Sequence, residues 1–252
     1  MKLETMGLSV GAVALAAALG ACNMQEPDRQ CSVARAVSDG SLGSFAATYT
    51  LKAGEPHPDR ACTQLKSESV GLQKYFNQDP SAPDTVAIRT DRMGRLRTQF
   101  RPRIDAASAG DPYAAGALAS ESPGPDNFCD VPELSPAQLD VPASATEPAQ
   151  SFSYEWSNLR IYNTPEIPGT QFIADLRYTE NGCTAEYTVR GIWPVVSCAT
   201  SGRPDEVKCD PYPDFDAGRL RGSGINPIFP VKCDPVALIC VLTGEVPSDR
   251  KP

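Results

Sequence analysis

Six arginines lie close together in the first half of the chain, within residues 89–103. The guanidinium group is planar, permanently charged and able to donate paired hydrogen bonds to carboxylates and phosphates. The whole chain carries a net charge of −8, so this local excess of positive charge is unusual. An anion-binding surface is one interpretation of the cluster, with Arg89, Arg95, Arg97 and Arg101 as candidates. The alternative is a solvated face that acidic residues elsewhere neutralise.

A second cluster of charged side chains is acidic. The stretch "DPYPDFDAG", residues 210–218, brings together Asp210, Asp214 and Asp216, and calcium-binding loops use such carboxylates. It lacks the bidentate glutamate of a complete calcium loop, so a solvated acidic loop is the alternative. A zinc site is not favoured, because no CxxC pair occurs and the only histidine, His57, stands between two prolines.

Motifs of the common enzyme classes are missing from the sequence beyond its N-terminal run. The single GxSxG match, residues 7–11, lies within the apolar N-terminal run of residues 6–21, and there is no HExxH, no phosphate-cradling glycine loop and no GxGxxG. Scattered aspartates and glutamates leave open a hydrolase that uses carboxylates alone. We therefore expect a protein that is not an enzyme and that needs no cofactor, and its acidity argues against nucleic acid as a partner.

The N-terminus carries an uncharged apolar run, residues 6–21, which is too short to span a bilayer and is typical of a signal peptide. The run ends in Leu19-Gly20-Ala21-Cys22. Here the sequence resembles bacterial lipoprotein precursors, whose lipobox is an aliphatic residue, two small residues and a cysteine. In that family the thiol receives a diacylglycerol, a signal peptidase cuts before the cysteine, and the new amine is acylated, for example with palmitate. The resemblance implies that Cys22 is the membrane anchor; the alternative is an ordinary signal peptide that leaves Cys22 as a thiol.

Cysteine number supports the same interpretation. The chain has nine cysteines, and removing Cys22 leaves an even eight, which suits four disulfides in an oxidising compartment. We expect local pairs such as Cys198–Cys209 and Cys233–Cys240. The eight candidates are Cys31, Cys62, Cys129, Cys183, Cys198, Cys209, Cys233 and Cys240.

Alternating apolar residues predict strands on both sides of the middle of the chain. Residues 45–51 and 152–156 alternate with period two, and the apolar run 236–242 is typical of a buried strand. Residues 70–76 fit either a strand or a short helix. In residues 85–100 we expect a hairpin around the loop Arg92-Met93-Gly94, which would set Arg89 opposite Arg97 on its outer face.

The strongest hairpin signal is Asn181-Gly182, the preferred dipeptide of a type I′ turn, within residues 172–189. A two-residue turn there gives a consistent apolar face and sets Arg177 opposite Glu186 on the other face. The predicted apolar pairs are Tyr178 with Ala185, Leu176 with Tyr187, and Ala174 with Val189.

These features predict a mainly β fold of antiparallel sheets, or a sandwich, built from hairpins, rich in loops and stapled by disulfides. The 24 prolines and 19 glycines fit short elements and many connections. The predicted organisation is a signal peptide over 1–21, a lipidated N-terminus and tether over 22–44, a β region over 45–104, a Pro/Ala/Ser-rich linker or excursion over 105–150, and a second β region over 151–252.

The expected function follows from the anchor and the missing catalytic motifs. By resemblance to lipoproteins, Asn23 after the acylated cysteine, in place of the aspartate that retains them in the inner membrane, implies the outer membrane of a Gram-negative bacterium. We expect a lipid-anchored outer-membrane or cell-surface binding module whose partner is an envelope protein or an anionic glycan. The alternatives are a periplasmic inhibitor or assembly factor, and a carboxylate-based hydrolase.

Overall fold

The computed structural model describes residues 29–34, 44–54, 59–79, 81–104 and 110–248. Strands dominate, with one α-helix and two short 3-10 helices among these residues. The elements in chain order are β1 (Ser44–Leu51), η1 (Ala61–Thr63), β2 (Glu68–Tyr75), β3 (Thr85–Thr90), α2 (Asp91–Gln99), β4 (Ala114–Ala117), β5 (Phe128–Glu133), β6 (Ala137–Val141), β7 (Gln150–Asn163), β8 (Pro168–Glu180), β9 (Cys183–Ile192), β10 (Ala199–Thr200), β11 (Arg203–Pro204), η2 (Glu206–Cys209), β12 (Val231–Cys233) and β13 (Cys240–Leu242).

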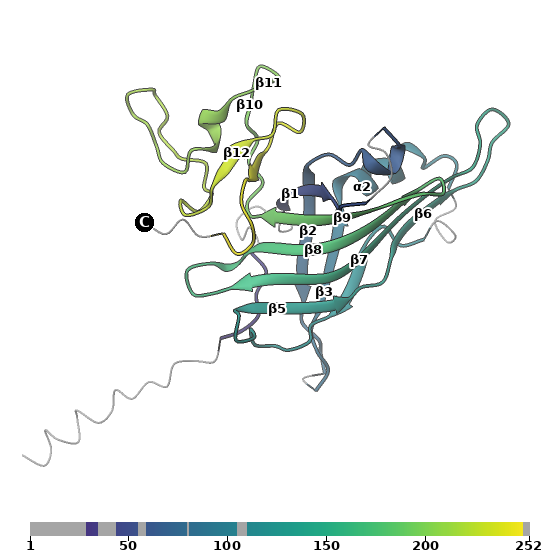
Figure 1. The fold of residues 1–252 in the computed structure, drawn as a ribbon, viewed down its shortest axis with the longest axis horizontal. Coiled ribbons are helices and arrows are strands. Elements are labelled where there is room, and N and C mark those ends of the chain that lie inside the picture. Colours follow the sequence, from purple (N-terminus) through teal and green to yellow (C-terminus); the bar gives the residue numbers. More distant parts are fainter. Residues whose placement is uncertain (1–28, 35–43, 55–58, 80, 105–109, 249–252) are drawn as a thin grey trace, which may run out of the picture.

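Nine of the strands form one antiparallel sheet in the order β4-β3-β2-β1-β9-β8-β7-β5, with β6 pairing with another part of β7. The sheet is strongly curled: β5, β7, β8 and β9 cross one side of the molecule, and β2 and β3 cross behind them (Figure 1). The two ends of the sheet, β4 and β5, approach each other. Two hydrogen bonds of 2.8 Å show this contact, one from the Ala119 amide to Asp130 O and one from the Ser135 amide to Ala115 O. The expected mainly β, antiparallel fold is confirmed, with one curled sheet enclosing the main core.

The main core lies inside the curl. Phe152, Tyr154 and Trp156 of β7 are at most 3% exposed, as their alternation predicts. The segment 68–75 is a strand, which settles the ambiguity left by the sequence. At one end of the curl, Met93 and Phe100, in and just after α2, pack against this core.

The hairpin of β8 and β9 is confirmed in register and face. Tyr178 pairs with Ala185, and Arg177 lies opposite Glu186. Asn181 and Gly182 both have positive φ, 51° and 80°, as a type I′ turn requires. The turn at Asn181-Gly182 therefore sets the pairing of β8 with β9.

The stretch predicted as a linker over 105–150 differs from that expectation. It contributes β4, β5 and β6 to the same sheet, so the two predicted β regions share one sheet. The three strands are short, and the Ala-Ala-Gly-Ala sequence of β4 has little intrinsic strand preference. Pairing with distant strands, which no local pattern records, defines them.

The C-terminal part of the chain packs on the outside of the sheet. A second cluster joins Phe229 and Leu242 to Ala46 of β1 and Ile192 of β9. In Figure 1 this part of the chain, with the short strands β10, β11 and β12, lies at the upper left, beside the large sheet. Only Cys240–Leu242 of the strand expected over 236–242 forms, and Val236 is 68% exposed.

Four disulfides use all eight candidate cysteines: Cys31–Cys129, Cys62–Cys183, Cys198–Cys233 and Cys209–Cys240. The expected local pairs Cys198–Cys209 and Cys233–Cys240 are wrong. Cys233 and Cys240 do lie opposite each other in β12–β13, but each is bonded to a cysteine of the preceding segment that packs beside this hairpin. Proximity in sequence was therefore a poor guide.

Candidate anion-binding groove

The predicted hairpin over 85–100 is wrong, and the reason lies at Thr90. Strand β3 ends there, and the Thr90 hydroxyl accepts a hydrogen bond from the Met93 amide at 3.1 Å, which caps the first turn of α2. Met93, Leu96 and Phe100 then follow at helical spacing and turn their side chains to the core. Gly94 lies inside the helix and makes no turn, so Arg89 on the strand does not face Arg97 across a hairpin.

Two of the six arginines, Arg92 and Arg103, form ion pairs with carboxylates from distant parts of the chain. Arg92 Nη2 lies 2.8 Å from Glu180 Oε2 and 3.0 Å from the Tyr178 hydroxyl, and so ties α2 to β8. Arg103 pairs with Glu147 and donates to two backbone carbonyls of the loop before β7. These two guanidinium groups hold the fold together and are not available to a ligand.

The contacts around Arg92 include a buried carboxylate. Glu68, 8% exposed, accepts hydrogen bonds from the Arg92 amide at 2.6 Å and from the Tyr49 hydroxyl at 3.0 Å. Burial raises the pKa of Glu68, and these hydrogen bonds oppose the shift. Burial, followed by the nearby Glu68 charge, raises the pKa of Tyr49 well above its ordinary value. This network fixes the N-terminus of α2 on the inner face of the sheet.

The other four arginines are the predicted candidates, and one hollow of about 1010 Å³ collects them all: Arg89, Arg95, Arg97 and Arg101. Arg95 pairs with Asp91 one turn away, and Arg97 donates to Gly110 O at 3.0 Å. Within the described parts of the chain, neither Arg89 nor Arg101 forms an ion pair with a carboxylate. The arginines converge from β3, from α2 and from the segment that follows it.

A second hollow of about 680 Å³ adjoins the first and shares Arg89, Asp91 and Gly94 with it. Small residues of the sheet line it, and two tyrosines border it: Tyr75, 50% exposed, and Tyr113, 44% exposed. We call the two hollows together the arginine groove. One half is basic and the other half offers aromatic surface. The sequence predicted the arginines as candidates but not the tyrosines, because Tyr75 comes from the end of β2 and Tyr113 from the segment before β4.

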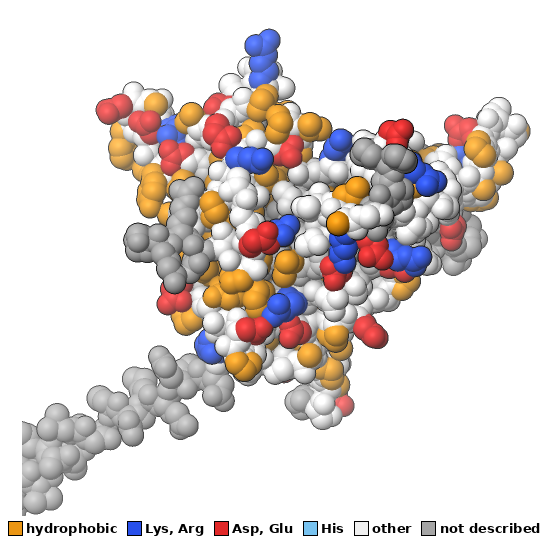
Figure 2. Space-filling model, in the orientation of Figure 1, with side chains coloured by type: hydrophobic (Ala, Val, Ile, Leu, Met, Phe, Trp, Pro, Cys, Tyr) orange, Lys and Arg blue, Asp and Glu red, His pale blue; other side chains and the backbone are white. Residues whose placement is uncertain are grey.

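Figure 2 shows Lys and Arg side chains interspersed with Asp and Glu over the face that it displays. The weak calcium candidate follows this pattern: Arg219 Nη2 lies 3.2 Å from Asp210 Oδ2 and 3.4 Å from Asp214 Oδ2, while Asp216 is exposed. A backbone hydrogen bond from Tyr212, with help from Arg219, lowers the pKa of Asp210. A calcium ion would have to displace this guanidinium group.

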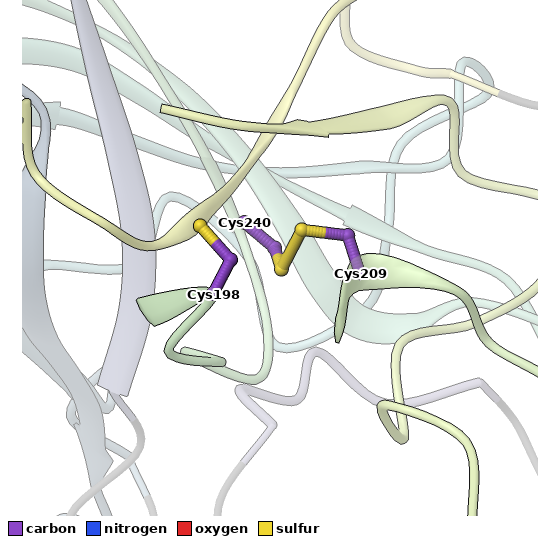
Figure 3. Close-up of side chains that lie close together, drawn as sticks. All are labelled: Cys198, Cys209 and Cys240. Carbon is purple, nitrogen blue, oxygen red and sulfur yellow. A yellow bond between two sulfur atoms is a disulfide. The ribbon is translucent and has the colours of Figure 1, made fainter. Parts of the chain in front are cut away.

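One group of potential metal ligands lies among the described residues. The sulfur atoms of Cys198, Cys209 and Cys240 are within 4.8 Å of one another (Figure 3). All three are oxidised in disulfides, Cys209 with Cys240 and Cys198 with Cys233. A metal site needs thiolates, so this cluster is two disulfides in contact and not a metal site.

Cys22, the lipidation candidate, lies outside the described residues, as do Asn23 and His57. Among the residues that the structure covers, no helix is long and apolar enough to cross a membrane. Four disulfides are typical of an exported protein and the lipobox is typical of a lipoprotein, so the class indicated is that of exported lipoproteins.

Comparison with known proteins identifies the family within this class. The family model MlpA matches residues 43–194, which span the sheet from β1 to β9 and include the arginine groove. A Myxococcus xanthus protein named "Putative lipoprotein MlpA" is 31% identical over 254 residues, which cover 98% of this chain and 97% of that protein. The chain therefore belongs to the MlpA family of lipoproteins. No solved structure matches it.

Proposed function

We propose that this lipoprotein is a binding module of the outer membrane, held there by acyl chains on Cys22, and that its arginine groove takes an anionic glycan of the cell envelope. The proposed activity is binding without turnover. The lipobox and Asn23 support the anchor and the outer membrane. Two or three acyl chains hold a protein firmly where one chain is marginal.

The observation that carries the proposal is that the six arginines fall into two groups, two in ion pairs with distant segments and four in the groove. Arg92 and Arg103 form ion pairs with carboxylates from distant segments, whereas the other four line one open groove on an otherwise acidic protein. Within the groove only Arg95 has a carboxylate partner among the described residues, Asp91 one helical turn away. Arginine pairs with carboxylate, phosphate and sulfate groups through parallel hydrogen bonds. Tyrosine rings beside them supply apolar surface with a polar hydroxyl, which suits an amphipathic sugar ring better than a bare ion.

The test reverses the charge of the groove and of a matched control surface. The groove variant is R89E/R95E/R97E, and the control R203E/R221E/K232E changes the net charge equally at three exposed positions in the C-terminal region. Binding to immobilised polygalacturonate and to purified lipopolysaccharide is measured. We expect the groove variant to lose at least tenfold in affinity and the control to keep its affinity. Equal affinity of the two variants for both probes would contradict the proposal.

The anchor has its own test, which does not involve the groove. Intact mass of the protein recovered from membranes should show an N-terminal acylated Cys22 and four disulfides. A Cys22→Ser variant should remain uncleaved and unacylated. Normal processing of that variant would show that Cys22 is not the lipidated residue.

A further inference from the structure

The first described segment of the chain, Arg29–Ala34, is fastened to one end of the sheet. Cys31 is bonded to Cys129 of β5, and the Cys31 amide donates to Glu121 O at 2.7 Å. Three residues on, the Ala34 amide donates to Gly169 O at 3.0 Å. The segment is therefore part of the folded body. The sequence predicts a tether over 22–44 that Cys31 pins in its middle, and the structure confirms that Cys31 is pinned.

Side chains hold the same segment. Two hydrogen bonds of 2.7 Å join Ser32 and Asn163: the Ser32 hydroxyl donates to Asn163 Oδ1, and Asn163 Nδ2 donates to Ser32 O. Lys74 Nζ donates to Cys31 O at 3.0 Å and lies 2.8 Å from both Asp84 Oδ2 and Glu121 Oε2. This ammonium group is thus neutralised by the carboxylates beside it.

This attachment leaves little chain between the body and the anchor. Only six residues separate Cys22 from Arg29. Seven Cα–Cα steps reach at most about 25 Å when fully extended, and about 15 Å as a flexible coil. A folded body of this size is roughly 45 Å across. Because the tether is shorter than the body is wide, the end that holds Arg29–Ala34 must stay near the membrane.

A large apolar side chain is exposed at this same end. Phe76, directly after β2, is 73% exposed. Its ring lies 5.2 Å from Lys74 Nζ, and it lines a small cavity of about 120 Å³ together with Cys31, Ser32 and Val33. Phe76 is therefore held beside the segment from which the tether leaves. Moving an exposed aromatic ring from water into the headgroup region of a bilayer lowers the free energy of the system.

We infer that the end of the sheet carrying Arg29–Ala34 faces the membrane and that the Phe76 ring enters the lipid surface. The inference rests on the proposed acylation of Cys22. The partner is the lipid surface in which the anchor sits, since the tether length brings this end there without any other protein. The acyl chains and Phe76 then fix the protein at two points, which sets its orientation as well as its location.

The experiment places a tryptophan at Phe76 and at a matched control. Phe215, 71% exposed, lies in the loop 210–222 between η2 and β12. Figure 1 shows this loop at the upper left, well away from the β2–β3 connection at the bottom. Acylated full-length F76W and F215W are reconstituted into phosphatidylcholine vesicles with brominated acyl chains, because a zwitterionic lipid does not repel an acidic protein. The parent protein, with Trp156 and Trp193, gives the baseline.

Bromine should quench at least half of the added fluorescence of F76W and less than a tenth of that of F215W. Far-ultraviolet circular dichroism of both variants should match the parent, since both rings are in solvent. Equal quenching of the two variants, or stronger quenching of F215W, in protein that floats with the vesicles would overturn the orientation alone. Failure of the protein to float would overturn the anchor and the orientation with it.

Discussion

Removing the disulfide between Cys31 and Cys129 tests how the N-terminal segment is held. The perturbation is the double variant C31A/C129A, which leaves the other three bridges in place. The bridge joins residues 98 apart in the sequence. Its main effect is on the unfolded chain, because a cross-link over a long loop removes many conformations that the folded protein never uses.

The magnitude follows from the loop length and the neighbouring bridge. A loop of about 100 residues corresponds to roughly 4.7 kcal/mol of unfolding free energy. Cys62–Cys183 overlaps this loop and already shortens the path between Cys31 and Cys129 in the unfolded chain. Since the cost varies only with the logarithm of length, the expected loss falls slightly, to about 4 kcal/mol. The hydrogen bonds of Cys31 and Ala34 to the body remain, so the native segment should stay in place.

The assay is urea unfolding of detergent-solubilised protein, followed by the fluorescence of Trp156 and Trp193, of which Trp156 is 3% exposed. The comparison variant is C209A/C240A, which opens a bridge between residues 31 apart. Cys198–Cys233 overlaps this loop in the same way, so the expected loss is about 3 kcal/mol. A loss below about 1 kcal/mol for C31A/C129A would refute the reasoning. It would mean that the unfolded chain is already held compact by other means.

Two further predictions concern buried groups of the sheet. Burial raises the pKa of Glu68 above its ordinary value of 4.5, so the folded state binds this proton more tightly than the unfolded state does. The resulting gain in unfolding free energy is fully present below pH 4.5 and is lost as the pH rises through the pKa of the folded state. The groups that face Glu68 are Tyr49, Arg92 and Arg95. The unfolding free energy of the parent should therefore fall relative to that of E68Q between about pH 4 and 7. A difference between the two proteins that does not change with pH would contradict this. A Cβ at Gly191 would lie 2.1 Å from the Phe172 ring, so Gly191→Ala should cost about 1–3 kcal/mol in chemical unfolding, and adding Phe172→Leu should recover part of that loss. Equal stability of G191A and the parent would show that the ring moves freely.

The parts of the fold that the sequence predicts well are those set by neighbours in the chain. Asn181-Gly182 specifies a turn, and the turn specifies the register of β8 and β9. The predicted hairpin over 85–100 does not form, because Gly94 lies inside a helix and makes no turn. The cap at Thr90 and the helical spacing of Met93, Leu96 and Phe100 outweigh the turn preference of this glycine.

The parts that could not be predicted depend on contacts between distant residues. Strand β4 is made of alanines and a glycine and is defined by its pairing with β3. In the arginine groove, the four candidates are adjacent in sequence, but Tyr75 and Tyr113 come from separate segments and carry no local signal. The arginine cluster was visible as composition, whereas the groove is a product of tertiary structure.

The position of β1 in the sheet has a consequence for how the protein is made. This first strand lies between β2 and β9, so one of its two neighbours is about 140 residues further along the chain. For a polypeptide that emerges from a translocation channel N-terminus first, β1 must wait for β9, and Cys62 must wait as a free thiol for Cys183. The sheet can therefore close only after β9, which ends at Ile192 of the 252 residues, has emerged, and until then its apolar strands are open to proteases and to misfolding.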